Sequence, residues 1–89
     1  MLTKTPHPRA GFQIERLDGE IVLFHPAGET IIHSNESGAL VWQLCDGARS
    51  VAEITAILSA AYPDAAASIA ADVANILLAF AEHGALELV

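Results

Sequence analysis

The feature that most limits the fold of this chain is the stretch SNESGALVWQLCDGARSVAEI, residues 34–54. Its first two residues, a serine and an asparagine, are both good helix N-caps, and Asp46-Gly47 interrupts the helical pattern that follows. A second start signal comes directly afterwards, because Ser50 and Glu53 have the spacing of a capping box. The stretch therefore predicts two helices joined by a tight turn, which is how a helix-turn-helix begins.

Apolar residues recur at helical spacing in both helices and again beyond Pro63. A third helix is expected from about Asp64 or Ser68 to His83, where Gly84 ends it before a short extended segment, ALELV. The predicted apolar faces of the three helices are Leu40, Val41 and Leu44; then Val51, Ile54, Ile57, Leu58 and Ala61; then Ile69, Val73, Ile76, Leu77 and Phe80.

The region before these helices is rich in β-branched and aromatic residues, with breaks at Asp18-Gly19 and at residues 26–28. Asp-Gly between alternating runs is typical of a type I′ hairpin turn, which needs positive φ at both central residues. Three short strands are predicted: Phe12–Leu17, Glu20–His25 and Glu29–His33.

The hairpin turn also predicts which side chains share a face of the sheet. A two-residue turn pairs Leu17 with Glu20, and alternation then places one set toward the core: Phe12, Ile14, Ile21 and Leu23. If the second turn centres on Ala27-Gly28, Ile32 joins that set, and Val22, Phe24 and Ile31 lie outside. A longer loop would shift the third strand by one residue. The outer residues are expected to form an exposed apolar strip for a second copy, as a homodimer, or for a partner enzyme.

The chain length of 89 residues fits one small α+β domain. Residues 1–10 contain two prolines and no periodicity, which predicts a flexible N-terminal tail followed by a domain over residues 11–89. No apolar run approaches the roughly 18–20 residues of a membrane span, so no membrane partner is expected. The first ten residues lack an apolar signal segment, and a cytoplasmic location is predicted.

The residues that could carry chemistry do not form a plausible catalytic centre. Cys45, the single cysteine, lies at the end of an apolar helix with no histidine near it in sequence, and a buried, inert thiol is expected. The four histidines are scattered, without HxxxH or CxxC spacing, so no metal site is predicted. Arg49 beside Asp46 is expected to be a surface pair of little energetic weight. The chain is therefore predicted to be no enzyme and to need no cofactor.

The charge of the chain argues against DNA as the partner of this helix-turn-helix. Four Lys and Arg residues stand against eleven Asp and Glu, a formal net charge of −7. The third helix, where a DNA reader would place basic and amide side chains, holds no lysine or arginine. Without cations the main contribution to DNA affinity is missing.

A set of short motifs lies in order along residues 11–88: Asn35-Glu36-Ser37-Gly38-Ala39, Trp42, Cys45-Asp46-Gly47, Ser50-Val51-x-Glu53-Ile54, Asp72-Val73 and Gly84-x-Leu86. With these motifs, residues 11–88 resemble the PqqD family, the small peptide chaperones of pyrroloquinoline quinone biosynthesis and their relatives that recognise ribosomally made, modified peptides. One departure is Ser34, where the family usually has an apolar residue.

The resemblance implies a winged helix-turn-helix that binds the leader segment of a precursor peptide and presents it to a modifying enzyme. In the family the leader adds as a strand beside the third strand, in a groove shared with the third helix. An open edge strand and a mixed flank of the third helix independently suit an extended peptide. The expected peptide-binding residues are Thr30, Ile31, Ile32, His33, Ser34, Asp72, Asn75, Ile76 and Ala79.

Two other functions stay open at the level of sequence: a winged-helix transcriptional regulator and a general protein-interaction adaptor. The resemblance further implies a partner enzyme such as a radical SAM enzyme or a lasso-type protease or cyclase. It names neither the peptide nor the pathway.

Overall fold

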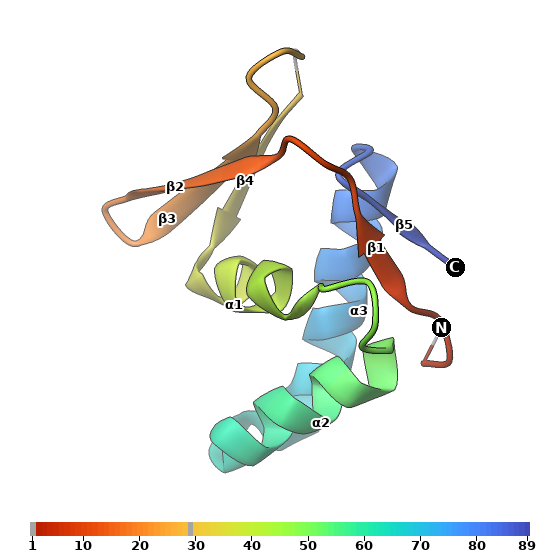
Figure 1. The fold of residues 1–89 in the computed structure, drawn as a ribbon. Helices are drawn as coiled ribbons and strands as arrows, with labels where there is room; N and C mark the ends of the chain where they lie inside the picture. The colour runs from red at the N-terminus through yellow and green to blue at the C-terminus, as the bar shows by residue number, and fades with distance from the viewer. Residues whose placement is uncertain (1, 29) are drawn as a thin grey trace.

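The structure, a computed structural model, describes residues 2–28 and 30–89, with a three-stranded sheet above a set of helices (Figure 1). The predicted α+β fold, with three antiparallel strands followed by three helices, is confirmed. The elements in chain order are β1 (Pro6–Pro8), β2 (Gln13–Leu17), β3 (Glu20–Phe24), β4 (Ile31–Asn35), α1 (Glu36–Leu44), α2 (Val51–Ala61), the short 3-10 helix η1 (Pro63–Ala65), α3 (Ala66–Glu82) and β5 (Leu86–Leu88).

The hairpin between β2 and β3 has the predicted turn and register. Asp18 and Gly19 both have positive φ, 40° and 82°, as a type I′ turn requires. Leu17 pairs with Glu20, and every other pair of the hairpin follows from that one. Ile21 and Leu23 are fully buried on the face that meets the helices, so the predicted core face is correct.

The third strand of the sheet, β4, begins and ends two residues later than predicted. Glu29 lies outside the described residues, whereas Asn35 still pairs with Glu20 at the far end. The strand extends this far because Asn35 both completes the ladder and caps α1, its side-chain oxygen accepting from the Gly38 amide at 3.1 Å. The predicted pairing of Leu23 with Ile32 is confirmed, so the alternative one-residue shift is excluded.

Helices α1 and α2 begin at the predicted caps Asn35 and Ser50, whereas α3 begins at Ala66 without a side-chain cap. Parts of the apolar faces are more exposed than expected. Ser50 and Glu53 form the complete capping box of α2. Ile57 and Ala61, predicted on the apolar face of α2, are exposed, because Val51, Ile54 and Leu58 alone turn toward the core. In α1 only Val41 of the predicted stripe is fully buried, and its two leucines are half-buried. Helix α3 starts after η1 and ends one residue before His83.

The N-terminal segment differs from the predicted flexible tail. Pro6–Pro8 form β1, antiparallel to β5, and Pro6 is buried. Two backbone carbonyls of this segment also accept hydrogen bonds from the first amides of α2. The Val51 amide donates to the Lys4 carbonyl at 2.9 Å, and the Ala52 amide donates to the Leu2 carbonyl at 3.0 Å. Proline-rich sequence without periodicity carries no strand signal, so this pairing depends on contacts far along the chain. Met1 lies outside the described residues.

Helix α3 is the central support of the domain. With η1 it forms a stretch, Pro63–Glu82, that is long and apolar enough to cross a membrane by length and composition, at a mean hydropathy of 1.5. The expectation that no segment approaches a span is therefore wrong on composition, because the many alanines raise the mean. One side of α3 packs in the domain core through Ile69, Val73, Leu77 and Phe80.

Candidate functional site

Strand β4 forms one edge of the three-stranded sheet, since among the described residues it pairs only with β3. The His25 amide donates to the Thr30 carbonyl at 3.4 Å, where the two strands diverge into their loop. Hydrogen bonding alternates along an antiparallel pair, so the backbone groups of Ile32 face β3. The same alternation turns the backbone groups of Ile31 and His33 to the open edge. These unpaired groups are suited to a further strand.

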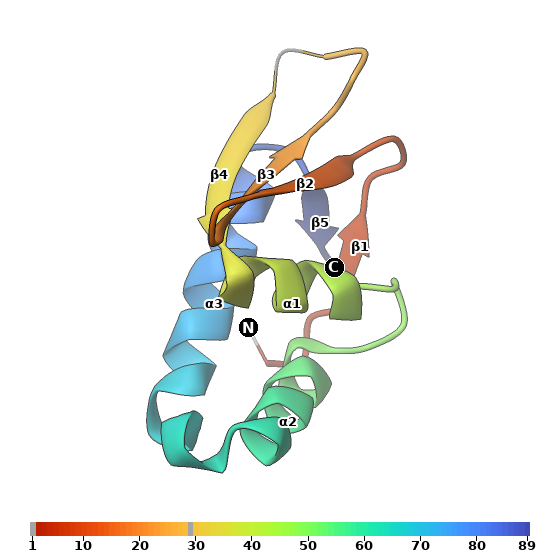
Figure 2. The ribbon, with the colours of Figure 1, turned by 90° about the vertical axis from the view of Figure 1, so that its left-hand side faces the viewer.

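A groove of about 390 Å³ lies beside the C-terminal half of β4. Figure 2 shows β4 at the outer edge of the sheet, with α3 passing below it. Helix α3 packs mainly on α2, α1 and β5 rather than on β4, so the space along the strand stays open. The groove is lined by Glu20, His33, Ser34, Asn35 and Ile76.

The structure brings some of the nine expected site residues together and separates others. His33, Ser34 and Ile76 line the groove, whereas Ile32 is buried in the core and Ile31 is exposed on the outer sheet face. Thr30 lies half-buried just before the strand. Asp72 lines a neighbouring cavity, while Asn75 and Ala79 line neither.

Sequence reasoning missed Glu20 and Asn35 as lining residues of the groove. The sequence did contain a signal for both residues. The hairpin turn puts Glu20 at the start of β3, and the register between β3 and β4, continued to the end, pairs Glu20 with Asn35. Asn35 was assigned to helix capping alone, although its position at the junction of β4 and α1 gives it both roles.

Ser34, the departure from the family pattern, has a matching residue on α1. Ser34 lies on the core side of β4 opposite Ile21, and Gly38 is buried directly against it. A Cβ on Gly38 would collide with the Ser34 hydroxyl and approach Phe80. The small residues together let α1 begin close under the strand, and Ser34 places a hydroxyl in the lining of the groove.

The surroundings of the groove are acidic. Glu20 lines it, and Glu36 follows immediately at the start of α1. Arg16 of β2 reaches Glu36 at 3.3 Å, but both side chains are more than half exposed, so this ion pair is worth little. No lysine or arginine lines either of the two cavities. An anionic ligand such as a nucleic-acid backbone would meet repulsion here.

The environment of Cys45 makes its thiol a weak acid. The Cys45 thiol donates to the Val41 carbonyl at 3.1 Å, and burial, with a smaller contribution from the Asp46 charge, raises its pKa to about 12. A thiol with that pKa carries almost no thiolate at neutral pH, so it is a poor nucleophile. Within residues 2–28 and 30–89, no cluster of His, Cys, Asp and Glu could hold a metal ion.

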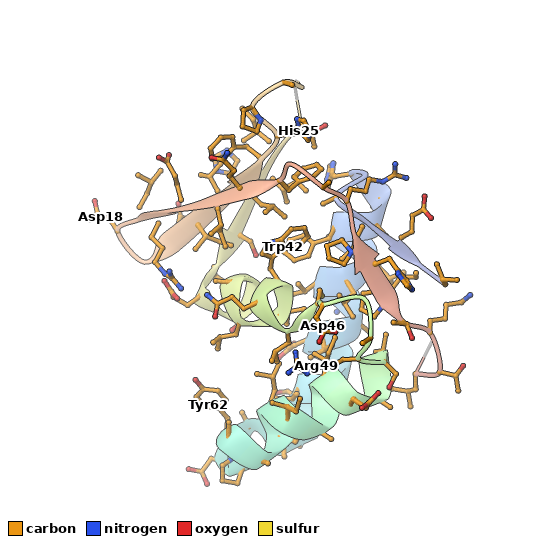
Figure 3. The ribbon with its side chains drawn as sticks, viewed as in Figure 1. Asp18, His25, Trp42, Asp46, Arg49 and Tyr62 are labelled. Atoms are coloured by element: carbon orange, nitrogen blue, oxygen red, sulfur yellow. The ribbon has the colours of Figure 1, made fainter. Side chains whose placement is uncertain are left out.

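The turn between α1 and α2 is fixed by hydrogen bonds and an ion pair of its own residues. Asp46 accepts from the backbone amides of Ala48 and Arg49 at 2.9 Å each, and these hydrogen bonds lower the pKa of its carboxyl. Arg49 also reaches the Asp46 carboxylate at 3.2 Å. Both lie at this turn in Figure 3, while Trp42 projects into the interior between the sheet and α3. The turn holds the two helices in place and offers no cavity of its own among those described.

Comparison with known protein families decides the relationship. The profile of the family described as "Coenzyme PQQ synthesis protein D (PqqD)" matches residues 20–86, well over half of the chain. The chain belongs to the PqqD family. The matched range contains β3, β4, all three α-helices and the whole of the β4 groove, so the candidate site lies within the family region.

A solved structure supports the PqqD-type fold. The structure "TbiB1 in Complex with the TbiA(beta) Leader Peptide" superposes with a TM-score of 0.70 at 23% sequence identity, covering 91% of this chain and 94% of that one. At this identity the likeness establishes the fold. A comparison with curated protein sequences gave no significant match.

Proposed function

We propose that this PqqD-family chain binds the leader segment of a ribosomally synthesised precursor peptide and presents it to a peptide-modifying enzyme. The observation that carries this proposal is the open edge of β4 beside a groove that Ile76 of α3 borders. An extended peptide added there satisfies the free backbone groups of Ile31 and His33, while its alternate side chains turn toward Ser34 and Ile76.

The similarity to a protein solved with a leader peptide supports this function by analogy, and family membership supports a non-catalytic role. The raised pKa of Cys45 agrees with that role, because it leaves the single thiol unreactive. A DNA-binding regulator is disfavoured by the net charge of −7 and by the absence of lysine and arginine from α3.

A division of labour within the site follows from its geometry. Main-chain hydrogen bonds along β4 would supply affinity that depends little on sequence, and the groove side chains would select among leaders. We propose that the peptide-binding surface comprises Thr30–Ser34 on the strand and Asp72, Asn75, Ile76 and Ala79 on the helix, extended by Glu20 and Asn35. The partner enzyme is proposed to be a radical SAM enzyme or a lasso-type protease or cyclase.

The test is a titration of ¹⁵N-labelled protein with the leader of the precursor peptide encoded beside the gene. Amide shifts should be largest at Ile31 and His33, which face the open edge, and at Ile76 on α3. A leader of the same composition in scrambled order is the control. Shifts concentrated on Asp46 and Arg49 at the helix turn, with β4 silent, would overturn the proposal.

A further inference from the structure

A second cavity, of about 350 Å³, lies among the helices next to the β4 groove. Its floor is apolar and belongs to the domain core, since Val41, Leu58, Ile69 and Val73 are all buried. Its volume is at the lower end of the range for small ligand pockets. The cavity is lined by Glu36, Ser37, Leu40, Val41, Leu58, Tyr62, Ala65, Ile69, Asp72, Val73 and Ile76.

The mouth of this helix cavity is polar and acidic. Glu36 and Ser37 approach from the first turn of α1, and Asp72 approaches from α3. Tyr62, half exposed, projects from the end of α2 toward α1 (Figure 3). Glu36 is partly neutralised by Arg16 at 3.3 Å, whereas Asp72 is in none of the salt bridges between described residues. Asp72 therefore leaves an uncompensated carboxylate at the mouth.

The helix cavity continues the β4 groove. Ile76 lines both spaces. Strand β4 ends at Asn35 and α1 begins at Glu36 without an intervening loop, so a chain that follows β4 past its end arrives at the mouth. A peptide strand long enough to pair with all of β4 thus meets the cavity with its next few residues.

We propose that this cavity binds an apolar side chain of the precursor peptide whose immediate neighbour is lysine or arginine, in the segment that passes the Asn35 end of β4. This assignment rests on the proposed strand addition. The apolar side chain would cover Ile69 and Val73, and the cationic neighbour would pair with Asp72. Charge complementarity selects a basic segment, because the cavity lining holds two carboxylates and no lysine or arginine.

The first experiment selects peptides from a displayed library of random 16-residue sequences on the immobilised protein. Enriched peptides should carry a large apolar residue next to lysine or arginine, beyond a stretch with alternating apolar residues. Selection on Asp72→Asn should lose the preference for the basic residue. Selection on Glu82→Gln, which removes the same charge from an exposed site at the far end of α3, should retain it.

The second experiment uses a peptide enriched on the unaltered protein and measures its affinity by calorimetry. Ala65→Trp fills the mouth from an exposed position and should weaken binding at least about tenfold, the factor expected from roughly 1.4 kcal/mol of lost apolar contact. Ala67→Trp, an equally exposed site outside the lining, is the control and should bind as the unaltered protein does. Asp72→Asn should weaken binding about two- to fivefold, as for an exposed ion pair, and replacing the basic residue of the peptide by norleucine should then cost nothing more.

Amide shifts separate this inference from the proposed function. Shifts at His33 and Ser34 together with Ser37, Tyr62 and Ile69 support both. Shifts confined to the strand, with Ala65→Trp binding normally, overturn the cavity assignment and leave strand addition standing. Shifts at neither surface overturn both. Concentration-dependent shifts at Ser37 and Tyr62 without peptide would mean that a second copy fills the cavity, which also overturns the assignment.

Discussion

The sheet has two open edges among the described residues, β2 and β4, and they differ in what surrounds them. Each edge exposes unpaired backbone N–H and C=O groups, because hydrogen bonding alternates along an antiparallel strand. On β2 these groups belong to Ile14 and Arg16, and on β4 they belong to Ile31 and His33. Strand β2 carries two charged residues in its five, and such charges discourage strand addition. Strand β4, with the sequence IIHSN, carries no Lys, Arg, Asp or Glu.

The second difference is the wall that faces each edge. Both described cavities border β4 or the helix that follows it, and neither is lined by a residue of β2. An open edge alone therefore does not make a binding site. The β4 edge becomes a candidate because Ile76 of α3 borders a groove beside it, and the predictions below test that distinction.

The largest effect is expected on the free energy of unfolding, from a substitution that weakens the packing of α3 in the core. Phe80 is fully buried and packs edge-to-face on Trp42 with ring centroids 5.7 Å apart. Phe80→Ala should lower the free energy of unfolding by about 3–5 kcal/mol, the usual cost of emptying an aromatic core site. Leu78→Ala, on the exposed side of the same helix, should change it by less than about 0.5 kcal/mol. Urea unfolding followed by tryptophan fluorescence measures both, and similar values for the two variants would contradict the assignment of α3 as the core support.

The next effect separates the two edges directly. His33→Pro removes an outward-facing donor of β4, and Arg16→Pro removes one of β2; proline is tolerated at such edge positions. Leader affinity should fall about tenfold or more for His33→Pro, because a peptide carbonyl loses its partner, and should stay within about twofold for Arg16→Pro. Calorimetry gives both values, with His33→Ala as the control for the side chain. Equal losses at the two edges would remove the distinction between them.

How far the sequence predicts this molecule depends on how local the determining contacts are. The hairpin register follows from Asp18-Gly19, because a two-residue turn leaves one pairing. The capping box at Ser50 likewise predicts the start of α2. The β1–β5 pairing and the helix cavity were not predicted, since each depends on segments far apart in the chain. Within the site, helical periodicity placed Ile76 at the border of the apolar stripe of α3, and the family resemblance placed that flank beside the third strand; in the structure Ile76 lines the groove with His33 and Ser34.

The same limit explains why Asp72, expected along the strand, lines the neighbouring helix cavity. Periodicity places Asp72 on the same flank of α3 as Ile76, but it cannot say which element lies opposite each turn of the helix. The structure sets Ile76 against the end of β4 and Asp72 against the first turn of α1. Crossing angles between helices, which depend on the packing of several side chains at once, decide that difference.

A smaller loss of leader affinity is expected from a substitution in α3 where it lines the groove. Ile76 is half-buried and lines both cavities, so Ile76→Ala removes apolar surface that an added peptide would cover. Leader affinity should fall about three- to tenfold. Each of the side-chain carbons removed is worth roughly 0.8 kcal/mol when fully buried, and the peptide would bury them only in part. Leu78→Ala on the opposite side of α3 is the matched control. Unchanged affinity in Ile76→Ala, measured by calorimetry on folded protein, would mean that α3 takes no part in binding.

The smallest effect on leader affinity is expected from a substitution on the outer face of the sheet, to which both edge strands contribute. Ile31 is 60% exposed there, and Val22 and Phe24 are half-buried beside it, so the predicted apolar strip is present but narrower than expected. Phe24→Glu places a charge on this face opposite Ile31, at the end of β3 far from Glu20, and Phe24 itself does not line the groove. Leader affinity should change by less than about twofold, whereas association with the partner enzyme or a second copy should weaken, because a charge in an apolar contact must be desolvated. Calorimetry with the leader and sedimentation equilibrium with and without the enzyme measure the two effects. If Phe24→Glu unfolds the domain, Phe24 belongs to the core; if it weakens leader binding alone, the peptide extends over the outer face as far as Phe24.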